Sequence, residues 1–193
     1  MIALDADLSQ RGVDTIVALL AGADAARQGY NPEIRVMINR HFLVYAHQAA
    51  WTAHLEGSLR AGQRCLVVMG SRGALERDVL DKVVARVNAW REEEEGGSPL
   101  VVRDYTSATG DDRKEDFCAI EAAWTGCDLV AYTPCVTVGS SFDLRDVFDR
   151  VYMYADARTA TPRVMNQMAG RVRHPKSHVV HTFIAGGGGG KRP

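Results

Sequence analysis

Apolar and polar positions change their period along the chain, and the changes predict an α/β fold. Short runs of consecutive apolar residues, typical of strands buried on both faces, precede longer runs in which apolar residues recur every three or four positions. The clearest strand covers residues 64–69, and a helix with a broad apolar stripe is expected over residues 74–90. This alternation indicates a mostly parallel sheet with helices on both faces.

The same alternation predicts the other elements. Further strands are expected over residues 1–8, 33–39, 100–105, 128–132, 151–154 and 178–184. Further helices are expected over residues 13–20, 47–59, 113–124 and 165–173. The Gly-rich end, residues 186–193, is expected to be a flexible tail by its composition.

Length and charge narrow the class of protein. With 193 residues, the chain has room for one domain, or for one domain and a fragment of another. A formal net charge of -1 argues against polybasic binding of nucleic acid but leaves room for a local basic groove, because charge distribution decides the chemistry of a site. No apolar run reaches the length of a membrane span, and the start of the chain is acidic where a signal peptide is basic. We expect a soluble intracellular protein with no membrane partner.

The spacing of cysteines and histidines predicts no metal site. The four cysteines are scattered without a C-x-x-C pair, which indicates reduced thiols in an intracellular protein. Three histidines lie close together near the C-terminus, at His174, His178 and His181. Pro175 interrupts any helix between the first two, so they are not expected to share a metal ion.

The run Q-x-x-G-R-x-R over residues 167–173 is the strongest candidate for chemistry. Arg171 and Arg173 carry planar forks of donors that grip phosphate oxygens and keep their charge. Gly170 allows the backbone to pass close to a partner surface. An isolated R-x-R is more often a solvated basic turn of helix, so its neighbours decide the interpretation.

A second run, over residues 132–143, supplies that context. It reads Y-T-P-C-V-T-V-G-S-S-F-D and places hydroxyls, a glycine and an acid directly after an apolar strand. A strand and loop of this kind, followed by a helix with Q-x-x-G-R-x-R, resembles motifs V and VI of superfamily 2 helicases. The pair is specific, whereas either motif alone is weak.

Over residues 1–185 the chain resembles the C-terminal half of the helicase region of replication origin-binding proteins of the herpesvirus type. The resemblance rests on the D-A-D-L block near the N-terminus and on four later blocks, residues 105–111, 124–128, 132–143 and 167–173. It implies the C-terminal domain of an ATP-dependent DNA helicase of DNA replication. The implied place of action is the nucleus or a viral replication site.

The resemblance also implies an architecture, because helicases of this superfamily place ATP between two facing RecA-like domains. It implies a remnant of the first RecA-like domain over residues 1–40, a linker helix over 41–61, and the second domain, a three-layer αβα sandwich, over 62–185. The chain lacks G-x-x-x-x-G-K-[ST] and D-E-x-[DH], which belong to the first domain, so its activity as an enzyme by itself stays open. ATP with Mg²⁺ is expected only with a first RecA-like domain, in cis or in trans, and single-stranded DNA is the other implied partner.

Site residues follow from the matched motifs. Arg171 and Arg173 are implied to stabilise the phosphoryl transition state, with Gln167 orienting one of them or the attacking water. The residues implied to bind nucleotide are Gly139, Asp143 and Gly170. The residues implied to contact nucleic-acid phosphates, mostly at carboxyl ends of strands, are Ser71, Arg72, Ser107, Thr109, Thr133 and Thr137.

Simpler interpretations stand beside these. Thr133 also suits the end of a strand, Ser71 a helix cap and Asp143 a turn cap. The aromatic residues Tyr105, Tyr132 and Trp124 fit a core better than a base-stacking surface. Two further functions stay open: a non-hydrolysing nucleic-acid-binding or regulatory module derived from a helicase, and an unrelated doubly wound nucleotide-binding protein. The lack of a G-x-G-x-x-G turn counts against the latter.

Overall fold

The computed structural model describes residues 40–95, 97–109, 115–135, 141–156 and 159–185. The strands in this part of the chain are β1 (His41–Tyr45), β2 (Cys65–Met69), β3 (Val102–Tyr105), β4 (Leu129–Tyr132), β5 (Arg150–Asp156) and β6 (Val179–Ala185). The helices are α2 (Gln48–Arg60), α3 (Arg72–Ala74), the π-helix η1 (Leu75–Val84), α4 (Ala85–Glu95), the 3-10 helix η2 (Glu115–Cys118), α6 (Ile120–Thr125) and α7 (Pro162–Ala169).

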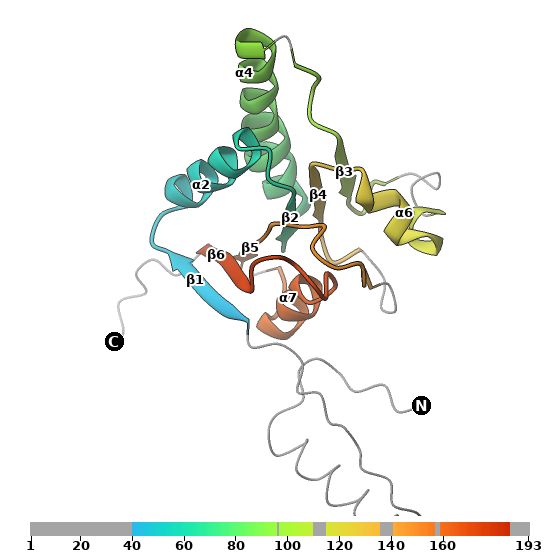
Figure 1. Cartoon of the computed structure of the whole chain (residues 1–193). Coiled ribbons are helices and arrows are strands. Elements are labelled where there is room, and N and C mark those ends of the chain that lie inside the picture. The colour runs from blue at the N-terminus through green and yellow to red at the C-terminus, as the bar shows by residue number, and fades with distance from the viewer. Residues whose placement is uncertain (1–39, 96, 110–114, 136–140, 157–158, 186–193) are drawn as a thin grey trace, which may run out of the picture. The chain divides into compact units, whose positions relative to one another are not determined.

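The six strands form one parallel sheet in the order β1-β6-β5-β2-β4-β3 (Figure 1). The central strands β2 and β4 are fully buried, which explains their continuous apolar sequences. Met69, Tyr105 and Tyr132 close the neighbouring strands β2, β3 and β4 at the carboxyl edge of the sheet. The expected α/β fold with a mostly parallel sheet is confirmed.

One face of the sheet is covered by α2 and by the continuous helix formed by α3, η1 and α4 (Figure 1). On α2 the residues at four-residue spacing, Trp51, Leu55 and Leu59, are all fully buried. They pack in one cluster with the apolar stripe of the long helix and with the residues of the central strands that point toward these helices, among them Val67 and Ala131. Burying these side chains is the main source of stability for this layer.

The opposite face is covered by α6 and α7, and aromatic side chains fill the space beneath them. The ring of Trp124 stacks on Tyr132 and Phe142, and its Nε1 donates to the Tyr105 hydroxyl at 3.0 Å. Tyr105 in turn donates to Asp116 Oδ2 at 2.7 Å. The three aromatic residues Tyr105, Tyr132 and Trp124 are therefore core residues, as their strands and helix predict.

Residues 41–61, the expected linker, hold β1 and α2, and both belong to this sandwich. Strand β1 pairs in parallel with β6, and α2 packs its apolar face on the sheet. Helix α7 begins three residues before its expected start, because Thr161 caps it by accepting from Val164 N–H at 3.3 Å and Pro162 fits the first turn. The elements expected over residues 1–8, 13–20, 33–39 and 186–193 lie outside the described residues.

A buried histidine joins α2 to the sheet. The imidazole of His181 on β6 is stacked on His54, with ring centroids 4.3 Å apart. Its Nε2 lies 3.2 Å from Nη1 of Arg150, and its Nδ1 lies 2.9 Å from the Tyr45 hydroxyl. Because a guanidinium can only donate, Nε2 accepts from Arg150 and Nδ1 carries the proton toward Tyr45. The ring is held neutral.

Acid is expected to weaken the fold through this residue. Burial, and then the charges of His54 and Arg150, lower the pKa of His181 from 6.5 to about 4. Between these two pH values the unfolded chain binds a proton that the folded chain excludes, so the free energy of unfolding falls as the pH drops through the window. We expect a loss of about 3 kcal/mol, measured by urea denaturation at successive pH values.

The control is a substitution that keeps the acceptor and removes the titration. His181→Gln is expected to reduce the pH dependence below pH 6.5, leaving the contribution of His54, whose pKa is also lowered by burial and by the charge of Arg150, whereas His178→Gln, at an exposed histidine, is expected to keep the wild-type slope. An unchanged slope in His181→Gln contradicts this assignment.

Candidate functional site

The arginines of Q-x-x-G-R-x-R follow a helix and do not lie on it. The expected helix through residue 173 is wrong at its end, because α7 stops at Ala169 and leaves Arg171 and Arg173 in the next segment. Gly170 N–H donates to the carbonyl oxygen of Asn166 at 2.9 Å. A Cβ on Gly170 would stand 3.2 Å from the same oxygen, so glycine relieves crowding where the chain leaves the helix. Gln167 is half-buried on the last turn of α7.

The segment after α7 pairs with the end of the loop that follows β4. Phe142 and Val172 form a parallel β-bridge, in which Phe142 N–H donates to Arg171 O at 2.8 Å and Arg173 N–H donates to Phe142 O at 3.0 Å. The side chains of Phe142 and Val172 are both fully buried. Two further backbone hydrogen bonds extend the pairing: Asp146 N–H donates to His174 O and Lys176 N–H donates to Phe148 O, both at 2.9 Å. The two sequence motifs are thus joined through their backbones.

This bridge fixes the direction of the two arginines. Side chains alternate along an extended segment, so burial of Val172 directs Arg171 and Arg173 to the other side of the bridge. Nε of Arg173 lies 2.9 Å from Oδ1 of Asp143, and Ser141 Oγ donates to Oδ2 of the same carboxylate at 3.2 Å. The side chains of Arg173 and Asp143 are 41% and 56% exposed, so the pair orients the guanidinium while adding little to stability.

Two donors from distant parts of the chain hold the backbone on which the arginines lie. The guanidinium of Arg40, just before β1, donates to the carbonyl oxygens of both Ala169 and Val172. The buried hydroxyl of Tyr132, at the end of β4, donates to Met168 O at 2.6 Å. Burial raises the pKa of Tyr132 well above its ordinary range, against the effect of nearby arginine charges, so this hydroxyl stays protonated and able to donate. Together the two side chains clamp the turn after α7.

The candidate phosphate contacts follow the carboxyl ends of three neighbouring strands. Ser71 stands in extended conformation at the start of α3, directly after β2, and its side chain makes no capping hydrogen bond there. Arg72 pairs with Glu76 one turn later, with Nε and Oε1 2.6 Å apart, and both side chains are exposed.

The hydroxyls after β3 and β4 are engaged in the local structure. Thr109 Oγ1 accepts from the backbone N–H of Thr106 at 2.7 Å, which closes a turn in which Ser107 is exposed. Thr133 is buried, and its hydroxyl donates to the carbonyl oxygen of Tyr105 at 3.5 Å. Of the candidates at this edge, Ser71, Arg72 and Ser107 therefore reach solvent most readily. The remaining candidates, Thr137 and Gly139, lie outside the described residues.

Arg40 and Tyr132 have a part in this site that sequence reasoning missed. Arg40 precedes β1 and gives no motif, and Tyr132 reads as a core aromatic residue. For Tyr132 the sequence offered one indication of this role, its position as the last residue of a strand that leads directly into a motif-bearing loop.

Among the residues that the structure describes, no group of three or more His, Cys, Asp and Glu side chains is arranged to hold a metal ion. Both ring nitrogens of His181 are engaged by Tyr45 and Arg150. No helix of the described part is long and apolar enough to cross a membrane.

Comparison with known proteins gives one sequence relative and several structural neighbours. No protein-family model matches the chain. The chain is 25% identical over 182 residues to a protein of Acanthamoeba polyphaga mimivirus named "Uncharacterized putative helicase R8". The match covers 90% of this chain but 16% of that protein.

Solved structures extend the likeness to the fold. The helicase Lhr of Mycobacterium smegmatis, solved with single-stranded DNA and AMP-PNP, is 16% identical with a TM-score of 0.50, over 76% of this chain and 19% of that one. The C-terminal part of the Fun30 ATPase domain has a TM-score of 0.46 at 10% identity, over 92% of this chain and 50% of that one. The likeness to Lhr shows that the α/β fold resembles that of a helicase RecA-like domain.

The clamp gives a testable consequence. In Arg40→Lys a single ammonium replaces the guanidinium. It is expected to leave either Ala169 O or Val172 O without its donor, which lowers the free energy of unfolding by roughly 1–3 kcal/mol. Amide hydrogen exchange at Phe142 and Arg173 is expected to speed up, because their hydrogen bonds depend on the position of the turn.

Arg103→Lys is the matched control. Arg103 is 44% exposed and lies 3.8 Å from Asp116, so its replacement is expected to leave both the stability and the exchange rates near wild type. If the amide hydrogen exchange rates of Phe142 and Arg173 are unchanged in Arg40→Lys, Arg40 does not hold the turn in place.

Proposed function

We propose that this chain is the C-terminal RecA-like domain of an ATP-dependent nucleic-acid helicase. The carrying observation is the backbone bridge between Phe142 and Val172, with Arg171 and Arg173 on either side of the buried valine. A helicase needs a nucleotide-sensing arginine to move with the loop that touches nucleic acid, and a shared backbone bridge supplies such a link. The fold and the viral helicase relative support the same class of protein.

In this proposal Arg171 and Arg173 meet the γ-phosphate of an ATP that is bound mainly by a first RecA-like domain, in cis or in trans. The nucleotide supplies the phosphoryl group and the free energy of its transfer to water. Each guanidinium offers a fork of donors that matches the non-bridging oxygens where charge develops. Gln167 orients an arginine or the attacking water, while Asp143 holds Arg173 ready through an exposed ion pair that a phosphate replaces at low cost.

The nucleic-acid partner is proposed to be single-stranded DNA, bound along the carboxyl edge of the sheet. Ser71, Arg72 and Ser107 are the accessible donors there, and they suit phosphate oxygens better than bases. The finer assignment, a replication helicase of the origin-binding type, remains part of the proposal and rests on the D-A-D-L block and the two motifs.

The test is reconstitution of ATP hydrolysis. This chain is added to a P-loop-bearing first RecA-like domain from the same source, and ATPase activity is measured with and without single-stranded DNA. DNA-stimulated hydrolysis is expected to appear only in the mixture, and Arg171→Ala is expected to lower it by about 10³-fold or more. Arg171→Lys is not expected to restore it, because an ammonium lacks the fork.

Arg103→Ala serves as the control, since it removes an exposed arginine from β3, and it is expected to keep the reconstituted activity. No activity in the mixture, or activity that survives Arg171→Ala, overturns the arginine-finger assignment. If the mixture binds DNA but never hydrolyses ATP, the chain is instead a binding module.

A further inference from the structure

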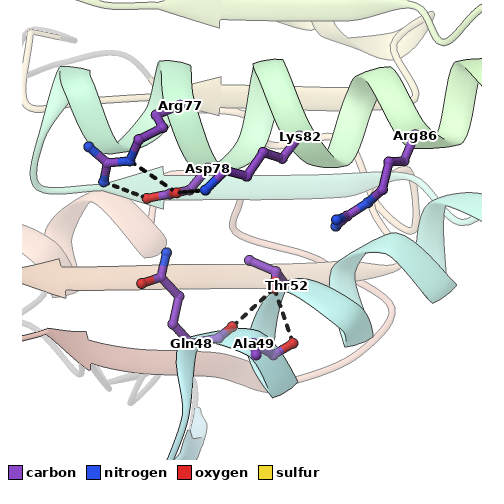
Figure 2. Close-up of a pocket in the computed structure, with 7 residues that line it drawn as sticks. All are labelled: Gln48, Ala49, Thr52, Arg77, Asp78, Lys82 and Arg86. Atoms are coloured by element: carbon purple, nitrogen blue, oxygen red, sulfur yellow. Dashed lines mark hydrogen bonds and ion pairs between the residues drawn. The ribbon is translucent and has the colours of Figure 1, made fainter.

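A groove lies between α2 and the long helix (Figure 2). It is on the face of the sheet opposite α7. It encloses about 540 Å³, and its lining residues are Gln48, Ala49, Thr52, Arg77, Asp78, Lys82 and Arg86. Figure 2 shows the charged side chains of η1 and α4 along one wall and Gln48, Ala49 and Thr52 of α2 along the other. None of the site residues discussed above lines it.

The charges of this groove are arranged in two layers. The carboxylate of Asp78 is 3% exposed and pairs with Arg77 at 2.7 Å and Lys82 at 2.9 Å, while these cations are 62% and 55% exposed. A similar pair follows at the start of α4, where Arg86 is 53% exposed and lies 2.8 Å from Glu56 of α2, which is 17% exposed. The carboxylates lie toward the protein interior and the cations toward solvent, so the surface of the groove that meets solvent is positive.

The lower layer keeps its negative charge at ordinary pH. Burial acts to raise the pKa of Asp78, but hydrogen bonds from Arg77, Lys82 and Gln48 outweigh burial and leave the pKa below its usual value. A charged Asp78 fixes the positions of Arg77 and Lys82 without a ligand.

Helix geometry sets the cations in a row. Arg77 and Lys82 are five residues apart, a spacing that divides them between two faces of an α-helix but brings them close to one face in the π-helix η1. Arg86 follows four residues later, on the same face at the start of α4. A row of fixed cations along a groove suits an extended chain of negative charges better than a single anion.

The lining decides which extended anion fits. None of the seven lining residues is aromatic, so the groove offers no platform on which a base stacks. Its apolar surface comes from Ala49, the methyl group of Thr52 and the methylene stems of the arginine and lysine side chains, so it lacks the large apolar anchors on which protein interfaces depend. Cations without stacking or apolar anchors match phosphate contacts, which give affinity without sequence preference.

We infer that this groove is a second nucleic-acid contact, in which Arg77, Lys82 and Arg86 bind the phosphodiester backbone of a strand. The inference rests on the proposed function, because it assigns an added surface to the same nucleic-acid ligand. It lengthens the binding site of the domain beyond the carboxyl edge of the sheet.

The test measures binding of the full chain to a fluorescein-labelled oligo(dT) strand by anisotropy at several KCl concentrations. Lys82→Gln leaves Asp78 paired with Arg77, and Arg86→Gln leaves Glu56 paired with Arg60 at 2.7 Å, so neither variant leaves a carboxylate unpaired. Each is expected to weaken binding severalfold and to lower the slope of log K against log[KCl] by about 0.7, the value for one phosphate contact on a single strand. Arg103→Gln, at a cation with 44% exposure on β3, is expected to change neither quantity.

A second measurement needs no variant. An oligonucleotide that carries an amine-reactive group on its backbone is bound to the wild-type chain, and the adduct is mapped by peptide mass spectrometry. An adduct on Lys82 is expected, and adducts confined to other lysines count against the groove.

The outcomes separate the two claims. If the wild type binds oligo(dT) and both groove variants bind equally well with the same salt slope, the groove inference is overturned while the proposed function stands. If the wild type binds no nucleic acid, the proposed function fails and the groove inference fails with it. If a polyglutamate peptide of equal charge displaces oligo(dT) from the groove at equal concentration, the ligand is an acidic protein segment and the nucleic-acid assignment is overturned.

Discussion

The backbone carbonyls at the end of α7 impose the constraint on which the candidate site depends. A helix leaves its last carbonyls without partners from its own backbone, and burying them unpaired is costly. Here three of these carbonyls accept hydrogen bonds: Asn166 O from Gly170 N–H, Met168 O from the Tyr132 hydroxyl, and Ala169 O from the Arg40 guanidinium. Satisfying the helix end therefore determines where the following arginines lie.

The donors come from parts of the chain that are far apart in sequence, which ties the site to the whole sheet. Arg40 stands before the edge strand β1, and Tyr132 ends the buried strand β4. The loop that follows Tyr132 returns to pair with Val172 through Phe142. A displacement of β4 thus reaches the arginines by two routes, the Tyr132 hydroxyl and the Phe142 backbone, so the site and the sheet are expected to move as one body.

The sequence was a good guide where burial alone decides the structure, as in the parallel strands and the apolar stripes of α2 and the long helix. It failed at the end of α7, because Val172 continues the apolar spacing of the helix although it is buried against Phe142 as an extended residue. It also missed β1, whose Phe42, Leu43 and Val44 stay exposed on an edge strand. The contacts of Arg40 span about 130 residues of chain, and no local pattern records such a pair.

The two cationic sites use carboxylates in different ways, and the difference follows from burial. Asp143 is 56% exposed, so its bond to Arg173 is screened by water and easily exchanged, as the proposed transient contact with a phosphate requires. Asp78 is 3% exposed and pairs with both Arg77 and Lys82, so its charge stays compensated when one partner is lost and is left unpaired in a poorly solvated place only when both are lost. The carboxylate of Asp78 therefore orients Arg77 and Lys82 in the absence of a ligand, so the proposed strand binds and dissociates without rearranging the protein.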